Sequence, residues 1–226
     1  MENWKQRTEA LIGTEALIKL ENTKVIVYGI GGVGSFVCES LVRAGVGNIT
    51  MVDNDVVSLS NINRQIHANI NTIGMLKTEV MKKRILEINP NCNVLIYSNI
   101  ENEEELIDNT YTYVIDAVDT VKTKISLAKR CKEQKVKQIA AMGAGNKLNP
   151  TKLRVSDISK TKVCKLAKVV RKELKRIGIE KLKVVYSEET SQKLKTEENI
   201  IGSISYMPST MGLIIASEVI KDILKI

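Results

Sequence analysis

The sequence lacks the cysteine pairs and histidine clusters that hold most structural zinc ions. Its four cysteines, Cys38, Cys92, Cys131 and Cys164, are scattered without a Cys-x-x-Cys pair, and His67 is its only histidine. This spacing argues against a zinc site, and we expect no zinc. For His67 and Cys164 we expect a structural place in the fold rather than a chemical role.

Long apolar runs are also missing. The N-terminus shows no basic stretch followed by an apolar core, and no apolar run is long enough to span a bilayer. The most apolar late segment, residues 211–215, is soon interrupted by Glu218 and Lys221. We therefore expect a cytoplasmic protein without a membrane partner, whose cysteines stay reduced.

Acidic residues are fewer than basic residues, and the difference arises in one segment of the chain. The chain carries 34 Lys and Arg against 26 Asp and Glu, a formal net charge of +8 at pH 7. Residues 160–195 hold twelve basic and four acidic residues, while the remainder holds 22 of each sign. A neutral body with one basic segment favours contact with a polyanion such as RNA, and a solvated basic helix is the simpler alternative.

The 226 residues, 43% of them apolar, alternate between strand and helix patterns. Alternation of this kind predicts a Rossmann-like, doubly wound α/β fold: a mainly parallel sheet with flanking helices and with ligands at the carboxyl ends of its strands. We expect a single domain over residues 1–226. The expected strands are residues 24–28, 49–53, 94–97, 113–118 and 138–142, and the expected helices are 33–44, 77–88, 121–134 and 209–224.

A basic α+β excursion at residues 146–199 interrupts this rhythm. Residues 153–158 have a strand pattern, and a helix pattern follows that ends near Gly178. The helix is expected to bury one apolar stripe on the sheet and to leave its basic residues in water. The stripe comprises Val163, Leu166, Val170, Leu174 and Ile177, and the basic residues are Lys165, Lys168, Lys172, Lys175 and Arg176.

A glycine motif follows the first expected strand. Gly29, Gly31 and Gly34 come directly after apolar residues 25–28, and Asp53 lies nineteen residues after Gly34. One glycine permits a tight turn, one lets a phosphate approach bare backbone, and one lets the next helix pack on the strand. Asp53 is placed to accept hydrogen bonds from ribose hydroxyls. Taken alone, the motif is typical of an NAD- or FAD-binding protein.

Charged residues downstream argue for a different use of this turn. A dinucleotide oxidoreductase does not cleave its cofactor, whereas an enzyme that attacks the α-phosphate of ATP needs cations to stabilise the developing charge. Arg64 offers a planar fork for phosphate oxygens, and Lys77 offers a point charge at the start of a helix. Asp119 follows a strand and can hold Mg²⁺. We predict these three residues as catalytic, with Asp119 also as the metal ligand.

The motifs together resemble the ubiquitin-activating-enzyme superfamily, whose members adenylate a carboxylate with ATP. The glycine motif, residues 53–55 and 59–65, Gly74 with Lys77, and residues 116–119 carry this resemblance. Within the superfamily the chain is more similar to the tRNA threonylcarbamoyladenosine dehydratases. That similarity rests on residues 143–148, 150–151, 157–161, 164–167, 171–174 and 184–187, and it fails at Lys165, where proline is usual.

The resemblance implies an ATP site completed by a second copy of the chain. An arginine of each subunit, here Arg7, would enter the ATP site of its partner in a homodimer. Mg²⁺ is implied with ATP, and a structural monovalent cation and a sulfur-donating partner protein are compatible with the resemblance. The implied nucleotide-binding residues are Gly29, Gly31, Gly32 and Gly34 in the turn, Asp53 and Asp55 after the next strand, and Asn61, Arg64, Gln65, Lys77 and Asp119 around the phosphates.

The activity implied is an ATP-dependent dehydration of threonylcarbamoyladenosine beside the anticodon of tRNAs that read ANN codons. Three alternatives remain open at this point. An adenylyltransferase that activates the C-terminus of a ubiquitin-like sulfur-carrier protein would normally carry two Cys-x-x-Cys pairs. An NAD-dependent oxidoreductase would have no use for Arg64, Lys77 and Asp119. A non-catalytic tRNA-binding protein would keep the fold without needing these side chains.

Overall fold

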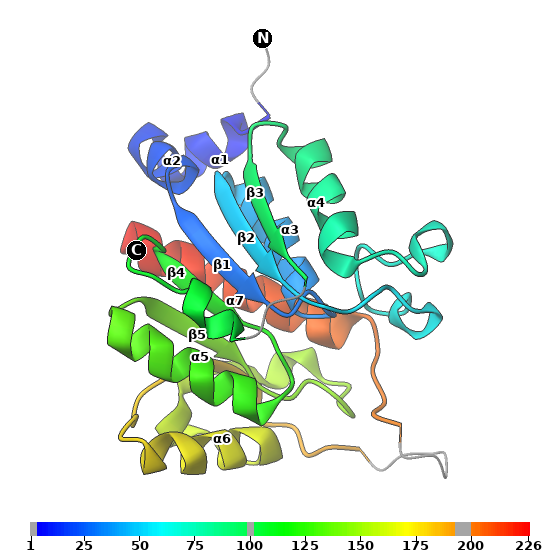
Figure 1. Ribbon diagram of the computed structural model, residues 1–226, viewed down its shortest axis with the longest axis vertical. Coiled ribbons are helices and arrows are strands. Elements are labelled where there is room, and N and C mark those ends of the chain that lie inside the picture. Colours follow the sequence, from blue (N-terminus) through cyan, green and yellow to red (C-terminus); the bar gives the residue numbers. More distant parts are fainter. Residues whose placement is uncertain (1–3, 99–101, 193–199) are drawn as a thin grey trace.

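The computed structural model describes residues 4–98, 102–192 and 200–226, and one sheet of seven strands organises them. The strand order is β3-β2-β1-β4-β5-β7-β6 (Figure 1). Neighbouring strands are parallel, except that β6 runs antiparallel to β7. The strands are β1 (Lys24–Tyr28), β2 (Asn48–Val52), β3 (Asn93–Tyr97), β4 (Tyr113–Asp116), β5 (Lys137–Ala141), β6 (Leu153–Asp157) and β7 (Lys183–Ser187).

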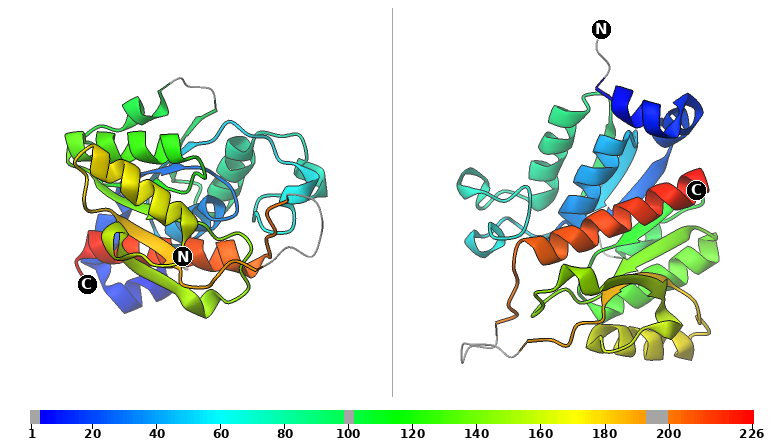
Figure 2. Two further views of the ribbon diagram at one scale, coloured as in Figure 1. Left: turned by 90° about the horizontal axis from the view of Figure 1, so that it is seen from below. Right: turned by 180° about the vertical axis from the view of Figure 1, so that it is seen from behind.

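Helices cover both faces of the sheet. Core residues of α3, α4 and α7 pack on one face, and those of α5 and α6 pack on the other. Figure 2 shows α7, in red, crossing the first face beside α3. None of the described helices is long and apolar enough to cross a membrane. The helices are α1 (Gln6–Ile12), α2 (Thr14–Glu21), α3 (Gly34–Ala44), α4 (Lys77–Ile88), α5 (Val121–Gln134), α6 (Lys165–Arg176) and α7 (Tyr206–Leu224).

The central strands are buried on both faces, which explains their nearly continuous apolar sequences. In β1, Val25 and Val27 join the core under α3 and α7, while Ile26 and Tyr28 join the core under α5. Successive side chains of a strand point to opposite faces, so these four residues supply both layers. The fold expected from the alternating pattern, an α/β Rossmann-like architecture with a mainly parallel sheet, is therefore confirmed.

The expected elements agree with the observed ones apart from their ends and three omissions. Helix α7 begins at Tyr206, three residues earlier than expected, and β4 ends at Asp116, two residues before the expected end. The polar helices α1 and α2 and the strand β7 were not expected. The excursion at 146–199 contributes β6 and β7 to the main sheet, so these two strands extend the sheet at its edge.

The buried stripe of α6 differs from the expected one at both ends. Val170 and Leu174 are fully buried, together with Ala167, which the pattern had not singled out. Val163 is 57% exposed and Ile177 is 44% exposed. Val163 precedes the first helical residue and has a φ of +62°, and Ile177 is the C-cap, so neither follows the helical period. The expected basic face of α6 is exposed. Residues 193–199, which include the end of the basic segment, lie outside the described residues.

Candidate active site

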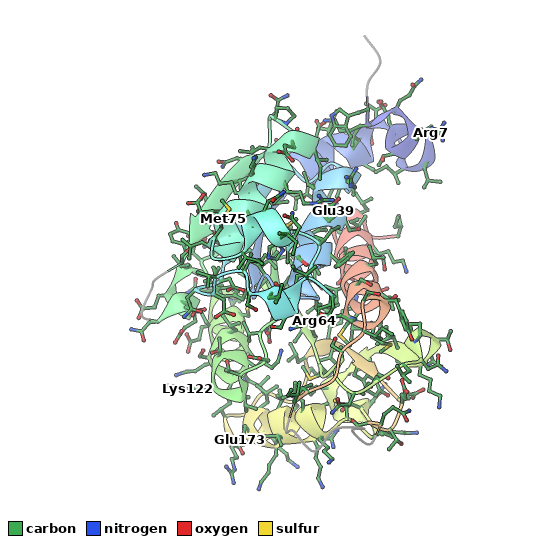
Figure 3. All side chains as sticks on the ribbon, turned by 90° about the vertical axis from the view of Figure 1, so that its right-hand side faces the viewer. Arg7, Glu39, Arg64, Met75, Lys122 and Glu173 are labelled. Atoms are coloured by element: carbon green, nitrogen blue, oxygen red, sulfur yellow. The ribbon has the colours of Figure 1, made fainter. Side chains whose placement is uncertain are left out.

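The glycine turn lies at the carboxyl ends of the parallel strands, between β1 and α3. The ends of β2 and β4 flank it, because both strands pair in parallel with β1. Figure 3 faces this edge of the molecule and shows Arg64 near its centre, with Lys122 of α5 below it. The structure thus brings the predicted residues of three successive strand ends to one edge.

The glycines of the turn are required by close contacts with neighbouring backbone. Gly29 has a φ of +83°, and a Cβ there would lie 2.7 Å from the Ala117 carbonyl oxygen. A Cβ on Gly34 would overlap the Gly29 carbonyl oxygen. A Cβ on Gly31 would instead have room, with Nε2 of Gln65 3.8 Å away. The turn is closed by Gly29 and Gly34, and at Gly31 its backbone is open to an anionic ligand.

Gly32 forms the other wall of the turn. A Cβ there would lie 3.1 Å from Cβ of Pro208 and 3.3 Å from Cγ of Arg64. The start of α7 and the arginine-bearing loop therefore both contact the glycine turn. The sequence pattern predicts only a helix at residues 209–224 and no site residue at its start.

Asp53 fixes the end of β2 against the glycine turn. Its Oδ2 accepts a hydrogen bond from the Ile30 amide at 2.6 Å, and its Oδ1 accepts one from the Asp55 amide at 2.8 Å. Burial, with smaller contributions from the Asp53 and Glu104 carboxylates, raises the pKa of Glu103. The Tyr28 hydroxyl donates to the Glu103 carbonyl oxygen at 2.8 Å. Both carboxylate oxygens of Asp53 therefore accept hydrogen bonds from backbone amides, and the ribose contact itself stays a prediction.

Lys77 is held in place by Asp55. The Lys77 ammonium donates to Asp55 Oδ2 at 2.6 Å, and the Lys77 amide donates to the Asp55 carbonyl oxygen at 3.1 Å. Lys77 is only 6% exposed, so it is not a solvated helix lysine. Asp55 thus orients the Lys77 ammonium, and the contact of Asp55 with the nucleotide stays a prediction.

The loop after β2 presents amide and guanidinium groups to the same edge. Asn61 is buried, and its Oδ1 accepts a hydrogen bond from the Ser58 amide at 3.1 Å. Arg64 Nη1 donates to the Ser60 carbonyl oxygen at 2.8 Å and to Asn63 Oδ1 at 2.9 Å. Gln65 is buried, and its Oε1 has no partner among the residues described. A buried polar atom without a partner beside the open backbone at Gly31 suits a site that a ligand completes.

Asp119 offers an open carboxylate. It lies in the turn between β4 and α5, it is exposed, and it accepts no hydrogen bond from the described part of the chain. The N-cap of α5 is Thr120, so capping does not explain Asp119. An unengaged carboxylate beside a phosphate site fits a Mg²⁺ ligand. No group of three or more His, Cys, Asp or Glu that could hold a metal by itself occurs in the described ranges.

Arg7 lies far from this edge within its own chain. It belongs to α1, and Figure 3 places it at the upper end of the molecule, away from Arg64 near the centre. The chain therefore does not bring Arg7 to its own glycine turn, and the predicted contact requires a second copy.

A segment that sequence reasoning missed crosses the same edge. Asn146 is joined to Gly202 by two hydrogen bonds: its amide donates to the Gly202 carbonyl oxygen at 2.8 Å, and the Gly202 amide donates to its Oδ1 at 2.6 Å. Asn63 Nδ2 donates to the Ser203 carbonyl oxygen at 3.1 Å. Residues 200–205 therefore link the turn after β5 to the arginine loop. The available signal was the Gly-Ala-Gly-Asn run at 143–146, since Gly145 leaves no room for a Cβ against Ile201.

His67 and Cys164 are buried, as expected for structural residues. Both ring nitrogens of His67 lack a partner among the residues described. Burial, with smaller contributions from Lys77 and Arg84, lowers the pKa of His67 to about 4. The imidazole is therefore neutral near pH 7 and adds no charge beneath the site.

Comparison with known proteins identifies close relatives over the whole chain. The ThiF family profile matches residues 5–226. A tRNA threonylcarbamoyladenosine dehydratase of Bacillus subtilis (strain 168) is 41% identical over 238 aligned residues, which cover 97% of this chain and 94% of the relative. The crystal structure of Escherichia coli tRNA N6-threonylcarbamoyladenosine dehydratase with AMP superposes with a TM-score of 0.92 at 34% identity, covering 100% of this chain and 96% of that one. The same enzyme in complex with ATP gives a TM-score of 0.88 at 33% identity, with the same coverage.

The low pKa of His67 predicts a specific dependence of stability on pH. Between about pH 6.5 and pH 4 the unfolded chain binds a proton at His67 that the folded chain does not, so the free energy of unfolding falls as the pH falls. The contribution of this residue is on the order of 3 kcal/mol in total. The measurement is urea unfolding from pH 7.5 to pH 4 for the native chain and for His67→Phe. Because the carboxylates titrate in both proteins, the native chain should lose more stability than the variant, and parallel curves would contradict the prediction.

Proposed function

This chain belongs to the ThiF family, and from that membership we propose that it is an ATP-dependent enzyme that cyclises threonylcarbamoyladenosine beside the anticodon of tRNA. One observation carries the proposal: the chain matches the Bacillus subtilis tRNA threonylcarbamoyladenosine dehydratase over nearly the full length of both proteins. The carboxyl edge of the sheet supports this proposal, because it suits a nucleoside triphosphate and a metal ion. The glycine turn, Arg64, Lys77 and Asp119 lie along this edge.

The first chemical step is the adenylation of a carboxylate. A carboxylate oxygen of the modified base attacks the α-phosphorus of ATP, a new P–O bond forms, and the bond to pyrophosphate breaks. Arg64 and Lys77 supply positive charge where the phosphoryl oxygens and the departing pyrophosphate gain negative charge. Asp119 would hold Mg²⁺, which neutralises phosphate charge when it is bound.

The second step closes a ring within the substrate. A nitrogen of the same modification attacks the activated carbonyl carbon, a C–N bond forms, and the C–O bond to AMP breaks. The nitrogen loses its proton, so the base has lost the elements of water overall. The nucleophile and the electrophile belong to one side chain, so proximity replaces an enzyme nucleophile. The burial of His67 and of all four cysteines agrees with this scheme.

Loss of the open carboxylate tests this function directly. With ATP and tRNA carrying threonylcarbamoyladenosine, we expect the native protein to release AMP and to convert the nucleoside to its cyclic form, measured by mass spectrometry. Asp119→Asn should lower the rate of AMP release about 100-fold or more, since one charge at the phosphates is lost. Lys129→Ala, an exposed position on α5, is the matched control and should retain the native rate.

Two results would contradict the proposal. AMP release stimulated only by a small ubiquitin-like protein, and not by tRNA, would support the sulfur-carrier adenylyltransferase instead. Unchanged levels of the cyclic nucleoside in cells that carry Asp119→Asn or Arg64→Ala would support a non-catalytic tRNA-binding protein.

We propose that the outer face of α6 binds the tRNA backbone. Lys165, Lys168, Lys172 and Lys175 are exposed there and form no ion pair within the described residues. Arg176 is paired with Glu173 at 2.9 Å. Figure 1 shows α6 as the outermost helix of its layer, so this row of ammonium groups is open to a polyanion.

Charge reversal on this face should weaken RNA binding and spare nucleotide binding. For Lys172→Glu/Lys175→Glu we expect at least a tenfold higher Kd for tRNA at low salt and a shallower dependence of binding on salt, since fewer counterions are released. The Kd for ATP should stay within about twofold of the native value, because α6 lies outside the glycine turn. Lys83→Glu/Lys225→Glu changes the same net charge on exposed residues elsewhere and should bind tRNA more tightly than the α6 variant. Salt-independent tRNA binding, or equal Kd values of the two variants for tRNA, would contradict the RNA contact and support the alternative that α6 is only a solvated basic helix.

We also propose that the functional unit is a homodimer in which Arg7 enters the partner's site. Helix α1, which carries Arg7, contributes no buried residue, and its Leu11 is 85% exposed. A second exposed apolar set lies between β2 and α4 and comprises Val56, Leu59, Ile70, Ile73 and Met75. Exposed apolar surface of this extent marks an interaction site, and a second copy is the occupant that would bring Arg7 to Arg64.

Subunit mixing tests this arrangement. Arg7→Ala and Asp119→Asn should each be inactive as homodimers, and we expect activity to return when the two proteins are unfolded together and refolded. Half of the dimers are then mixed, and each mixed dimer holds one complete site, so about a quarter of the native activity is expected. An Arg7→Ala homodimer with native activity, or mixtures without recovery, would contradict the contact.

We also propose a single domain, a cytoplasmic location, a structural monovalent cation and a sulfur-donating partner protein. A single domain is consistent with all seven strands lying in one sheet. Cytoplasmic location follows from a tRNA substrate. The structural monovalent cation and the sulfur-donating partner rest on the family resemblance alone.

A further inference from the structure

A completely buried ion pair lies beneath the turn that carries Asp119. The ammonium of Lys124 donates to Asp116 Oδ1 at 2.9 Å, and the side chains of both residues are 0% exposed. Asp116 is the last residue of β4, and Lys124 lies in the first turn of α5. The pair thus closes a loop of the chain whose exposed tip is Asp119.

The pair joins the Asp119 turn to two neighbouring strands. Lys124 also donates to the carbonyl oxygen of Ala141, the last residue of β5, at 2.7 Å. On the other side, the Ala117 amide donates to the Tyr28 carbonyl oxygen at 2.8 Å, at the end of β1. The Ala117 carbonyl oxygen also lies against Gly29. The turn is therefore fixed between the glycine motif and the end of β5.

Within the turn, one end is hydrogen-bonded to the Asp116 carboxylate and the other to the backbone of the first turn of α5. The Val118 amide donates to Asp116 Oδ1 at 3.2 Å, and the Lys124 amide donates to the Thr120 carbonyl oxygen at 3.2 Å. Asp119 lies between these two anchored residues. Its carboxylate is exposed, but its backbone has little freedom to move.

Stability does not account for the charges of this pair. Removing two ions from water offsets much of their attraction, and apolar replacements of buried pairs are often neutral or stabilising. Asp116 Oδ2 also lacks a partner among the described residues, which adds to the cost of burial. Burial raises the pKa of Asp116, against the opposing effect of Lys124. An apolar pair would fill the space as well, but it would not bind Val118 and Ala141.

We propose that Asp116 and Lys124 are positioning residues for adenylation, which fix the Asp119 turn through hydrogen bonds to Val118 and to the Ala141 carbonyl oxygen. The inference rests on the proposed function, because the turn that they hold carries the carboxylate assigned to the metal ion and the phosphates. Neither residue touches the solvent-exposed site, so both act through the backbone of residues 117–120.

Two double variants separate this role from a role in folding. Asp116→Leu/Lys124→Met removes the charges and hydrogen bonds but keeps the volume, and it should fold with a Tm close to that of the native chain. Its kcat for AMP release with modified tRNA should fall at least about 30-fold, while the KM for ATP stays within about threefold. Asp116→Asn/Lys124→Gln removes the charges and keeps hydrogen-bonding groups, so its kcat should fall less than about tenfold.

A control pair lies at the amino ends of the strands. Lys183 and Asp222 form an ion pair at 3.0 Å, and Lys183→Met/Asp222→Leu should change Tm without changing kcat. A folded apolar pair at 116 and 124 with native kcat would overturn the inference. If Asp116→Leu/Lys124→Met does not fold, the result for Asp116→Asn/Lys124→Gln decides. A folded Asp116→Asn/Lys124→Gln protein whose kcat falls about 30-fold overturns the inference, and a smaller loss of kcat supports it. A native protein that releases no AMP with modified tRNA would instead contradict the proposed function.

Discussion

The site depends on one close approach between backbone segments, at Gly29 and Gly34. A side chain on Gly34 would overlap the Gly29 carbonyl oxygen, and a side chain on Gly29 would meet the Ala117 carbonyl oxygen at 2.7 Å. Because both side chains are absent, the end of β1, the start of α3 and the turn after β4 meet at one point. Asp53 and Asp119 both lie near this contact, since Asp53 accepts a hydrogen bond from the Ile30 amide and Asp119 comes two residues after Ala117.

The cations of the site are held by fixed partners before any ligand binds. Asp55 holds the Lys77 ammonium, and a backbone carbonyl with Asn63 holds the Arg64 guanidinium. Groups that are already oriented need little reorganisation when phosphate charge develops, which is the main way in which a polar site stabilises a transition state. The same principle explains why a buried pair beneath Asp119 matters more for orientation than for stability.

The sequence predicted the elements whose signal is local. A strand buried on both faces is nearly continuously apolar, so β1 was predicted with its observed ends, and the helical pattern of α4 likewise predicted both of its ends. Strand β7 was missed because residues 183–187 form a short run soon after a lysine-rich helix, and the antiparallel pairing of β6 is set by distant contacts. Arg64 and Asp119 follow strands, and the sequence therefore predicted them as site residues. Lys124 has the sequence signature of any helix lysine, and only the fold brings its ammonium to the Ala141 carbonyl oxygen.

The strand pairing of the sheet determines where the basic segment lies relative to the site. Strand β7 pairs in parallel with β5, so the helix before β7 packs beside α5 in the same layer. Helix α6 begins near the carboxyl end of β5, where Cys164 Sγ and Leu166 Cβ lie 4.0 Å from the position of a Cβ on Gly143. Its exposed lysines therefore start at the edge that carries the glycine turn and run away from it. A polyanion bound along α6 would have one end at this edge, which suits a substrate whose backbone is recognised at a distance from the carboxylate that reacts.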